Sequence, residues 1–156
     1  MRKLTVFLLL IIAGVLQVEA ASIAEVRSLY LQAAEQEEQC EKLSTISIPN
    51  ESADASAMRG YKAAATMMMA KYVFNPLAKI SYFRKGKKML ENAILADGRN
   101  VELRFLRFTI QTNAPSFLGY NQNINSDKRY LVQTLPSVKD PALKTMITAY
   151  LKNQKT

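Results

Sequence analysis

The segment NVELRFLRFTIQTN, residues 100 to 113, limits the possible fold of this chain more than any other. Successive side chains of an α-helix turn by about 100°, so its large apolar residues fall into two groups on nearly opposite sides. The groups are Val101, Phe105 and Phe108 on one side and Leu103, Leu106 and Ile110 on the other. A helix with two apolar faces has to lie between two neighbouring elements. The segment therefore predicts a layered helical domain in which residues 101–113 are sandwiched.

Polar residues run along both flanks of this predicted helix, between its two apolar faces. They are Glu102, Thr109 and Asn113 on one flank and Arg104, Arg107 and Gln111 on the other. Neither arginine has an acidic residue three or four positions away, so any partner has to come from outside the helix. In one interpretation the arginines pair with acids of the first helix or with Asp127. In the other, Arg104, Arg107 and Gln111 form a ligand- or partner-binding site that grips a carboxylate or phosphate.

Helix start signals divide the rest of the chain after residue 20 into segments of similar kind. Residues 22–25 (SIAE) form a capping box, and Asn75-Pro76 and Asp140-Pro141 each place proline directly after a capping residue. The predicted helices cover about residues 23–43, 54–72, 76–96, 101–113, 126–136 and 141–151. No segment shows the sustained alternation of a β-strand. The sequence therefore predicts an all-α domain of about six helices in a compact, irregular bundle.

The first twenty residues have the features of a secretory signal peptide. A charged start at residues 1–3 precedes an apolar run from Leu4 to Leu16, and Val18-Glu19-Ala20 supplies the small–x–small pattern that a signal peptidase reads. As a helix this run spans only ~20 Å, well short of the ~30 Å hydrocarbon core of a bilayer. We therefore predict a signal peptide over residues 1–20 and a single helical domain over residues 21–156. The domain is expected to be exported, periplasmic or extracellular, without a stable membrane span after cleavage.

Composition excludes several kinds of chemistry. The chain has no histidine and one cysteine, Cys40, which rules out histidine-based catalysis, an intramolecular disulfide and the usual zinc ligand sets. No glycine-rich phosphate-binding loop is present. We predict that Cys40 is a buried apolar residue on one seam of the first helix. The seam consists of Val26, Leu29, Ala33, Cys40 and Leu43. We expect no cofactor, no metal and no enzymatic activity.

An asparagine-rich stretch before the fifth predicted helix alternates in the manner of calcium-loop ligands. The alternating residues are Asn121, Asn123, Asn125 and Asp127. However, Ser126 stands where such a loop needs glycine, and Val132 stands where it needs glutamate. We interpret the stretch as a connector whose side chains close turns and cap the following helix.

The chain is basic, with 21 Lys and Arg against 13 Asp and Glu and a net charge of +8. Residues 21–54 hold seven acids and two bases, whereas residues 55–156 hold five acids and seventeen bases. Either an acidic first helix lies against a basic body, or a basic face is open to an anionic partner. The cluster Arg84-Lys85-Gly86-Lys87-Lys88 points in several directions around its helix. We interpret it as a solvated face and expect no nucleic-acid partner.

Two resemblances are visible in the middle of the chain. The pattern Gly86-x-x-x-Leu90-x-x-Ala93, followed by the turn at residues 97–100 and a new helix, resembles the second helix and turn of a tetratricopeptide repeat. This resemblance implies a helical hairpin of that kind, although Gly98 stands where the family usually has proline. The run from Tyr61 through "NPLAKISYFRKGKKMLENAI", "NVELRFLRFTIQ" and "FLGYNQNINSDKRYL" is similar to a group of small exported proteins of Bacteroidota that lack an assigned function. That likeness implies an exported, helical protein.

The sequence predicts binding rather than catalysis. We expect an exported interaction module that binds a protein or peptide partner in the cell envelope. The alternative is a periplasmic carrier of a small apolar or anionic ligand held between helices, with the arginine stripe as its charged handle. The run Met67-Met68-Met69 is consistent with adaptable core packing, and methionine-rich faces also accept varied partners. An enclosed apolar cavity lined by methionine and phenylalanine would favour the carrier, and a shallow basic groove would favour the interaction module.

Overall fold

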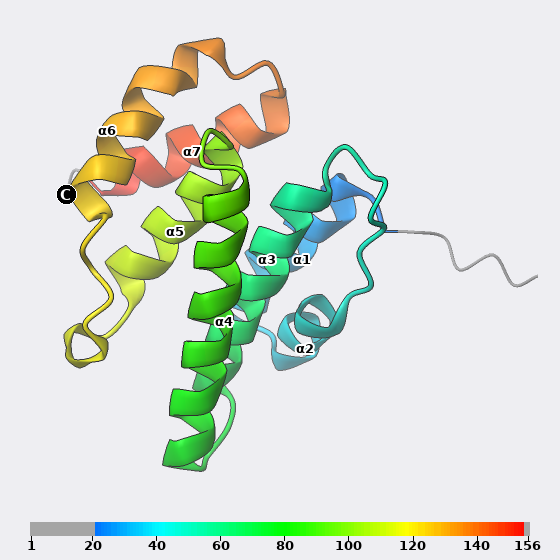
Figure 1. The fold of residues 1–156 in the computed structure, drawn as a ribbon, viewed down its shortest axis with the longest axis vertical. Coiled ribbons are helices and arrows are strands. Elements are labelled where there is room, and N and C mark those ends of the chain that lie inside the picture. The colour runs from blue at the N-terminus through cyan, green and yellow to red at the C-terminus, as the bar shows by residue number, and fades with distance from the viewer. Residues whose placement is uncertain (1–20, 155–156) are drawn as a thin grey trace, which may run out of the picture.

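The computed structural model describes residues 21–154 and folds them entirely into helices and their connections (Figure 1). The α-helices are α1 (Ile23–Ala33), α2 (Glu37–Thr45), α3 (Ala55–Met68), α4 (Pro76–Ala96), α5 (Val101–Asn113), α6 (Ile124–Thr134) and α7 (Pro141–Asn153). Three short 3-10 helices follow α3, α5 and α6: η1 (Met69–Lys71), η2 (Ser116–Leu118) and η3 (Leu135–Ser137). The predicted all-α class is confirmed, with seven α-helices in the described residues instead of about six.

The predicted signal peptide, residues 1–20, lies outside the described residues. Within residues 21–154, no helix is both long and apolar enough to cross a membrane.

The extra helix arises because the predicted first helix is broken in two. After Ala33 the chain leaves the helix, and Gln36 adopts an extended conformation (φ −128°, ψ 113°) before α2 begins. Glu37 and Glu38 occupy the first turn of α2, where negative charge is favoured by the helix dipole. The predicted seam is nevertheless buried, including Cys40. The residues of the seam lie on α1 and α2, which both pack against α3. The periodicity therefore predicted the buried face correctly, but the prediction of one helix was wrong.

Helices α3 and α4 form the most extensively packed pair in the molecule, and they lie side by side in Figure 1. Asn75 caps α4 by accepting hydrogen bonds from the amides of Leu77 and Ala78, as the sequence predicts. Close approach is possible because Gly86 has no side chain. A Cβ at that position would lie 2.5 Å from the Ala63 carbonyl oxygen and 2.7 Å from the Met67 nitrogen. The glycine that begins the tetratricopeptide-like pattern therefore has a role in local packing, because it lets α4 contact the backbone of α3.

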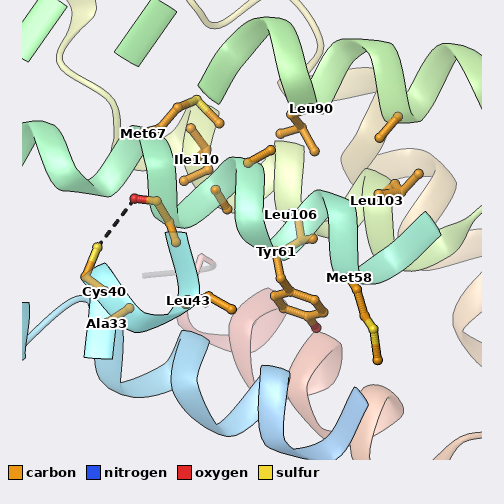
Figure 2. Packing of buried hydrophobic residues seen from close by; sticks show 14 of the residues in the cluster. Ala33, Cys40, Leu43, Met58, Tyr61, Met67, Leu90, Leu103, Leu106 and Ile110 are labelled. Carbon is orange, nitrogen blue, oxygen red and sulfur yellow. Dashed lines mark hydrogen bonds between the residues drawn. The ribbon is translucent and has the colours of Figure 1, made fainter. Parts of the chain in front are cut away.

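Helix α5 separates two hydrophobic cores, as its two apolar faces predict. Leu103, Leu106 and Ile110 belong to the larger core, which is built from α1 to α5 (Figure 2). Phe105 and Phe108 belong to a smaller core shared with α6 and α7. The smaller core also contains Leu131, Leu143, Ile147 and Leu151. The sandwiched position of α5 is confirmed, and the helix joins the two halves of the domain.

Helices α6 and α7 close the smaller core. Helix α6 begins at Ile124, two residues before the predicted start, and the side chain of the preceding Asn123 forms no capping hydrogen bond. Helix α7 begins at Pro141 as predicted, with Asp140 accepting hydrogen bonds from the amides of Ala142 and Leu143. Leu151, near the end of α7, is buried, so the last helix docks on the body.

Candidate functional site

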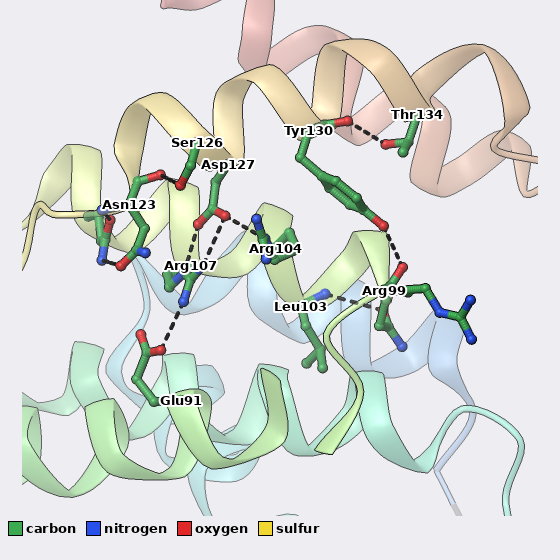
Figure 3. Close-up of polar contacts among 12 residues, drawn as sticks. Glu91, Arg99, Leu103, Arg104, Arg107, Asn123, Ser126, Asp127, Tyr130 and Thr134 are labelled. Atoms are coloured by element: carbon green, nitrogen blue, oxygen red, sulfur yellow. Dashed lines mark hydrogen bonds and ion pairs between the residues drawn. The ribbon is translucent and has the colours of Figure 1, made fainter. Parts of the chain in front are cut away.

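Arg107, the central residue of the predicted binding stripe, is buried between α4, α5 and α6. Its Nε and Nη2 donate to the two carboxylate oxygens of Asp127 at 2.7 and 2.9 Å, and its Nη1 donates to Glu91 Oε2 at 2.9 Å (Figure 3). Burial acts to lower the pKa of Arg107, but the bonds to Asp127 and Glu91 outweigh it and raise the pKa. The guanidinium is therefore fully engaged within the protein.

Arg104 lies one turn earlier on α5 and shares the same carboxylate. Its Nε is 2.5 Å from Asp127 Oδ1, as an ion pair whose N–H is not aligned for a hydrogen bond. Its guanidinium carbon lies 4.9 Å from the centre of the Tyr130 ring, which is within cation–π range. Arg104 is thus held between an acid and an aromatic ring of α6.

Gln111, the third member of the stripe, fixes the start of α6. Its Oε1 accepts from the backbone amide of Asn123 at 3.0 Å, and its Nε2 donates to Asn123 Oδ1 at 3.2 Å. All three candidate residues therefore contact groups of α4, α6 or the connection before α6. Pairing of the arginines with Asp127 is confirmed, and their role in binding a partner stays a prediction. The interpretation that asparagine side chains of the connector cap α6 is wrong: Asn123 stands at the capping position without a side-chain capping hydrogen bond, and Gln111 holds Asn123 instead.

The other polar flank of α5 is paired with α1 and α3. Arg27 donates through Nε and Nη2 to the carboxylate of Glu102 at 2.6 and 3.0 Å, and through Nη1 to Asp140 at 2.7 Å. The Tyr61 hydroxyl donates to Glu102 Oε1 at 2.5 Å. The bond to Glu102 raises the pKa of Arg27, and burial raises the pKa of Tyr61. Charged residues on both flanks of α5 are thus paired within the protein, although the buried Arg104 Nε has an ion-pair contact without a hydrogen bond.

Of the alternatives for the uneven charge, pairing of an acidic first helix with a basic body is not found in the described residues. The buried ion pair between these regions has the opposite polarity, with the base, Arg27, on α1 and the acid, Glu102, on α5. Within residues 21–154, the acids of the first segment form one ion pair, between Glu25 and Lys42, and both belong to that segment. Most of its acids are exposed.

Cys40 is unsuited to chemistry at neutral pH. Its thiol is buried and donates to the Ala65 carbonyl oxygen at 3.4 Å (Figure 2). Burial raises the pKa of the thiol to about 11, so the reactive thiolate is disfavoured. In the described part of the chain, no cluster of three or more acidic or cysteine side chains is placed to hold a metal ion.

An apolar pocket that the sequence did not predict lies between the end of α3, the first half of α4 and the end of α5. Its volume is about 600 Å³. The large apolar side chains that line it are Met67 and Met68 of α3, Ile80 and Phe83 of α4, Ile110 of α5, and Phe117 and Leu118 of η2. The pocket is partly open to solvent on one side.

The outer wall of the pocket is made by the connection that follows α5. Helix α5 ends at Asn113, because Ala114 is extended (φ −71°, ψ 138°) and Pro115 follows. The 3-10 helix η2 then brings Phe117 and Leu118 to the pocket. Gly119 reverses the chain in the left-handed conformation (φ 57°), which favours glycine. A short proline-and-glycine connection thus supplies one side of the pocket.

Exposed apolar side chains gather around this pocket. Phe74 is 98% exposed and Phe117 is 84% exposed, while Leu77 is largely exposed and Ile80 is partly exposed on the first turns of α4. Ile80 and Phe117 line the pocket, and Phe74 and Leu77 flank Pro76, which also lines it. These four are the majority of the seven large apolar side chains exposed in residues 21–154. Exposed apolar side chains in a pocket lining, and next to it in the sequence, are consistent with a binding site.

The charged residues of the pocket wall are two lysines. Lys71 donates to the Ala34 carbonyl oxygen and lies beside the Tyr72 ring, so its ammonium group is turned toward the end of α1. Lys79, on α4, forms no ion pair or side-chain hydrogen bond with another residue of the described chain. No acid lines the pocket.

The pocket was not predicted from the sequence because its wall comes from three separate segments, residues 67–71, 76–83 and 110–118. The run Met67-Met68-Met69 gave a partial signal, since two of its members line the pocket. A second signal was available at the start of α4, where Phe74, Leu77 and Ile80 extend the apolar residues beyond the face that packs on α3.

Comparison of the chain with known protein families, with curated proteins and with solved structures finds no match. The likeness to a tetratricopeptide hairpin and to exported Bacteroidota proteins therefore stays a prediction.

Proposed function

We propose that this protein is an exported helical binding protein of the cell envelope, and that the pocket between α3, α4 and α5 holds the apolar part of a small ligand. The observation that supports the proposal is a pocket of about 600 Å³ with walls of methionine, isoleucine and phenylalanine. Pockets for small ligands have volumes of roughly 300–1,000 Å³ and mostly apolar walls. Export rests on the features of residues 1–20.

The position of the arginine stripe also favours this choice. A basic groove was the feature expected of a module that binds an anionic partner through Arg104 and Arg107. Both guanidinium groups instead contact Asp127, which is completely buried. Opening them to a partner would leave that carboxylate without its charge partners, at a cost of several kcal/mol. Binding through the pocket requires no such rearrangement.

A neutral apolar dye, N-phenyl-1-naphthylamine, tests the proposal directly. Protein expressed from the full-length sequence is titrated with the dye, whose fluorescence rises in an apolar environment. We expect saturable binding that Ile80→Asp weakens at least about tenfold, because a carboxylate in the wall loses its hydration when the dye binds. Leu95→Asp is the matched control, since Leu95 is exposed on the same helix and does not line the pocket.

Two results would contradict the proposal. One is the absence of saturable dye binding by a protein that circular dichroism shows to be folded. The other is an equal loss of binding in Ile80→Asp and Leu95→Asp, which would place the dye elsewhere. Native mass spectrometry of protein purified from its own envelope provides an independent readout, as a co-purifying small molecule would add a discrete mass.

A second candidate function is recognition of a polypeptide, which was the first expectation from the sequence. The exposure of Phe74 and Leu77 favours it, because neither side chain lines the pocket and a ligand inside the pocket would leave both exposed. A photo-crosslinking residue at Phe117, with one at Leu95 as control, separates the two functions in the native envelope. A discrete crosslinked protein at Phe117 alone supports polypeptide recognition, and its absence supports the small ligand.

A further inference from the structure

We infer that the ligand of this pocket is a single-chain amphiphile with one negative charge, such as a long-chain carboxylate, whose head pairs with Lys79. The inference rests on the proposed function, because it names the class of ligand for the same pocket. It goes further by assigning one side chain to recognition of the ligand's charge.

The charge of the pocket wall supports an anionic head. The lining residues include two lysines and no acid, and Asn113 of α5 is the remaining polar residue of the lining. Two helix ends lie at the pocket and carry opposite partial charges. The start of α4, at Pro76, is positive, and the end of α5, at Asn113, is negative. Such opposite end charges offset each other, so the full charges of the lysines determine the sign.

Lys79 is the better placed of the two lysines. It precedes Phe83 by four positions on α4, so the two side chains lie on the same face of the helix. Phe83 is buried in the wall, whereas Lys79 is exposed. A lysine in this position lays its methylene chain along the apolar wall and keeps its ammonium group in water at the mouth. Lys71 already bonds to the Ala34 carbonyl oxygen, so Lys79 is the cation left for a ligand.

The same charges argue against a second copy of this chain as the occupant. A symmetric contact through the pocket would bring Lys79 and the neighbouring bases of α4 close to the same residues of the partner. Like charges brought together in this way oppose association, and the chain has a net charge of +8. An amphiphile with an acidic head can pack its apolar chain against the wall and pair its head with Lys79.

Displacement of bound N-phenyl-1-naphthylamine by dodecanoate and by 1-dodecanol tests the inference. The two molecules have the same chain length and differ in the charge of the head. In the wild type we expect dodecanoate to compete about three- to fivefold more strongly than the alcohol, the factor of a partly exposed ion pair. Lys79→Gln should remove this preference by weakening the binding of dodecanoate more than that of 1-dodecanol. Raising the salt concentration should reduce the preference in the wild type alone.

Lys85→Gln is the matched control, since Lys85 is an exposed lysine of α4 that does not line the pocket. Equal competition by dodecanoate and 1-dodecanol would overturn the inference, and so would an equal loss of preference in Lys79→Gln and Lys85→Gln. In either case, saturable binding of the dye would still support the proposed function. Failure of the dye itself to bind would instead refute the proposed function. The two failures are therefore distinguishable in one set of titrations.

Discussion

Replacing Arg107 by glutamine should destabilise the folded protein strongly. The Arg107 side chain is 6% exposed and its partner Asp127 is 0% exposed. The substitution removes one charge and the donor groups of three hydrogen bonds, two to Asp127 and one to Glu91. It leaves a buried carboxylate whose remaining charge partner is Arg104. Removing one partner of a buried ion pair costs about 3–5 kcal/mol. Because Arg104 stays close to Asp127, we expect the lower end of this range, about 3 kcal/mol.

Urea denaturation and thermal melting measure this cost. For a domain of this size, 3 kcal/mol corresponds to a decrease in melting temperature of roughly 10 °C. Arg129→Gln is the control, since Arg129 is exposed on α6 and its replacement should change stability by less than about 0.5 kcal/mol. Asp127→Asn should cost as much as Arg107→Gln, because it leaves two arginines without their acid.

The double variant Arg107→Gln/Asp127→Asn shows whether the two side chains act as a pair. If they do, the double variant costs less than the sum of the two single variants by at least about 1.5 kcal/mol. Additive costs, or a cost for Arg107→Gln no larger than that for Arg129→Gln, would refute the argument. Unchanged stability with loss of a native partner would instead establish Arg107 as a binding residue.

Three further predictions concern packing. Gly86→Ala should cost about 2 kcal/mol in denaturant unfolding, because the new Cβ meets the Ala63 carbonyl oxygen at 2.5 Å. Gly60→Ala, which meets only side-chain ends, should cost less, and the reverse order would contradict the packing of α3 on α4. Leu151→Asp should lower the free energy of unfolding by about 3–5 kcal/mol, since it buries a charge in the smaller core. A variant that melts at the same temperature as the wild type would show that α7 is not docked. Cys40 should react with a thiol reagent at least about 100-fold more slowly in the native than in the denatured protein. Rapid labelling of the native protein would contradict the burial of this thiol. Burial raises the pKa of Cys40 from 9.0 to about 11. The stability that the neutral thiol contributes is therefore full below pH 9 and is lost as the pH rises toward 11.

Local chemistry was sufficient to predict most helix boundaries. Asn75-Pro76 and Asp140-Pro141 begin α4 and α7 where the sequence placed them, because capping and proline geometry depend on neighbouring residues alone. The two apolar faces of α5 were also predicted, since helical periodicity fixes which side chains share a side. The break between α1 and α2 was not predicted, because the buried seam runs through both helices and residues 34–36 contain no glycine or proline.

The sequence by itself thus determined the helices, the sandwiched position of α5 and the lack of histidine chemistry. Only the tertiary structure decided what each polar residue of α5 contacts. Arg27 and Glu102 are 75 positions apart, and no local pattern brings a base of one helix to an acid of another at that separation. The pocket has the same origin: α3, α4, α5 and η2 each supply part of its wall, so it exists only once these segments are packed together.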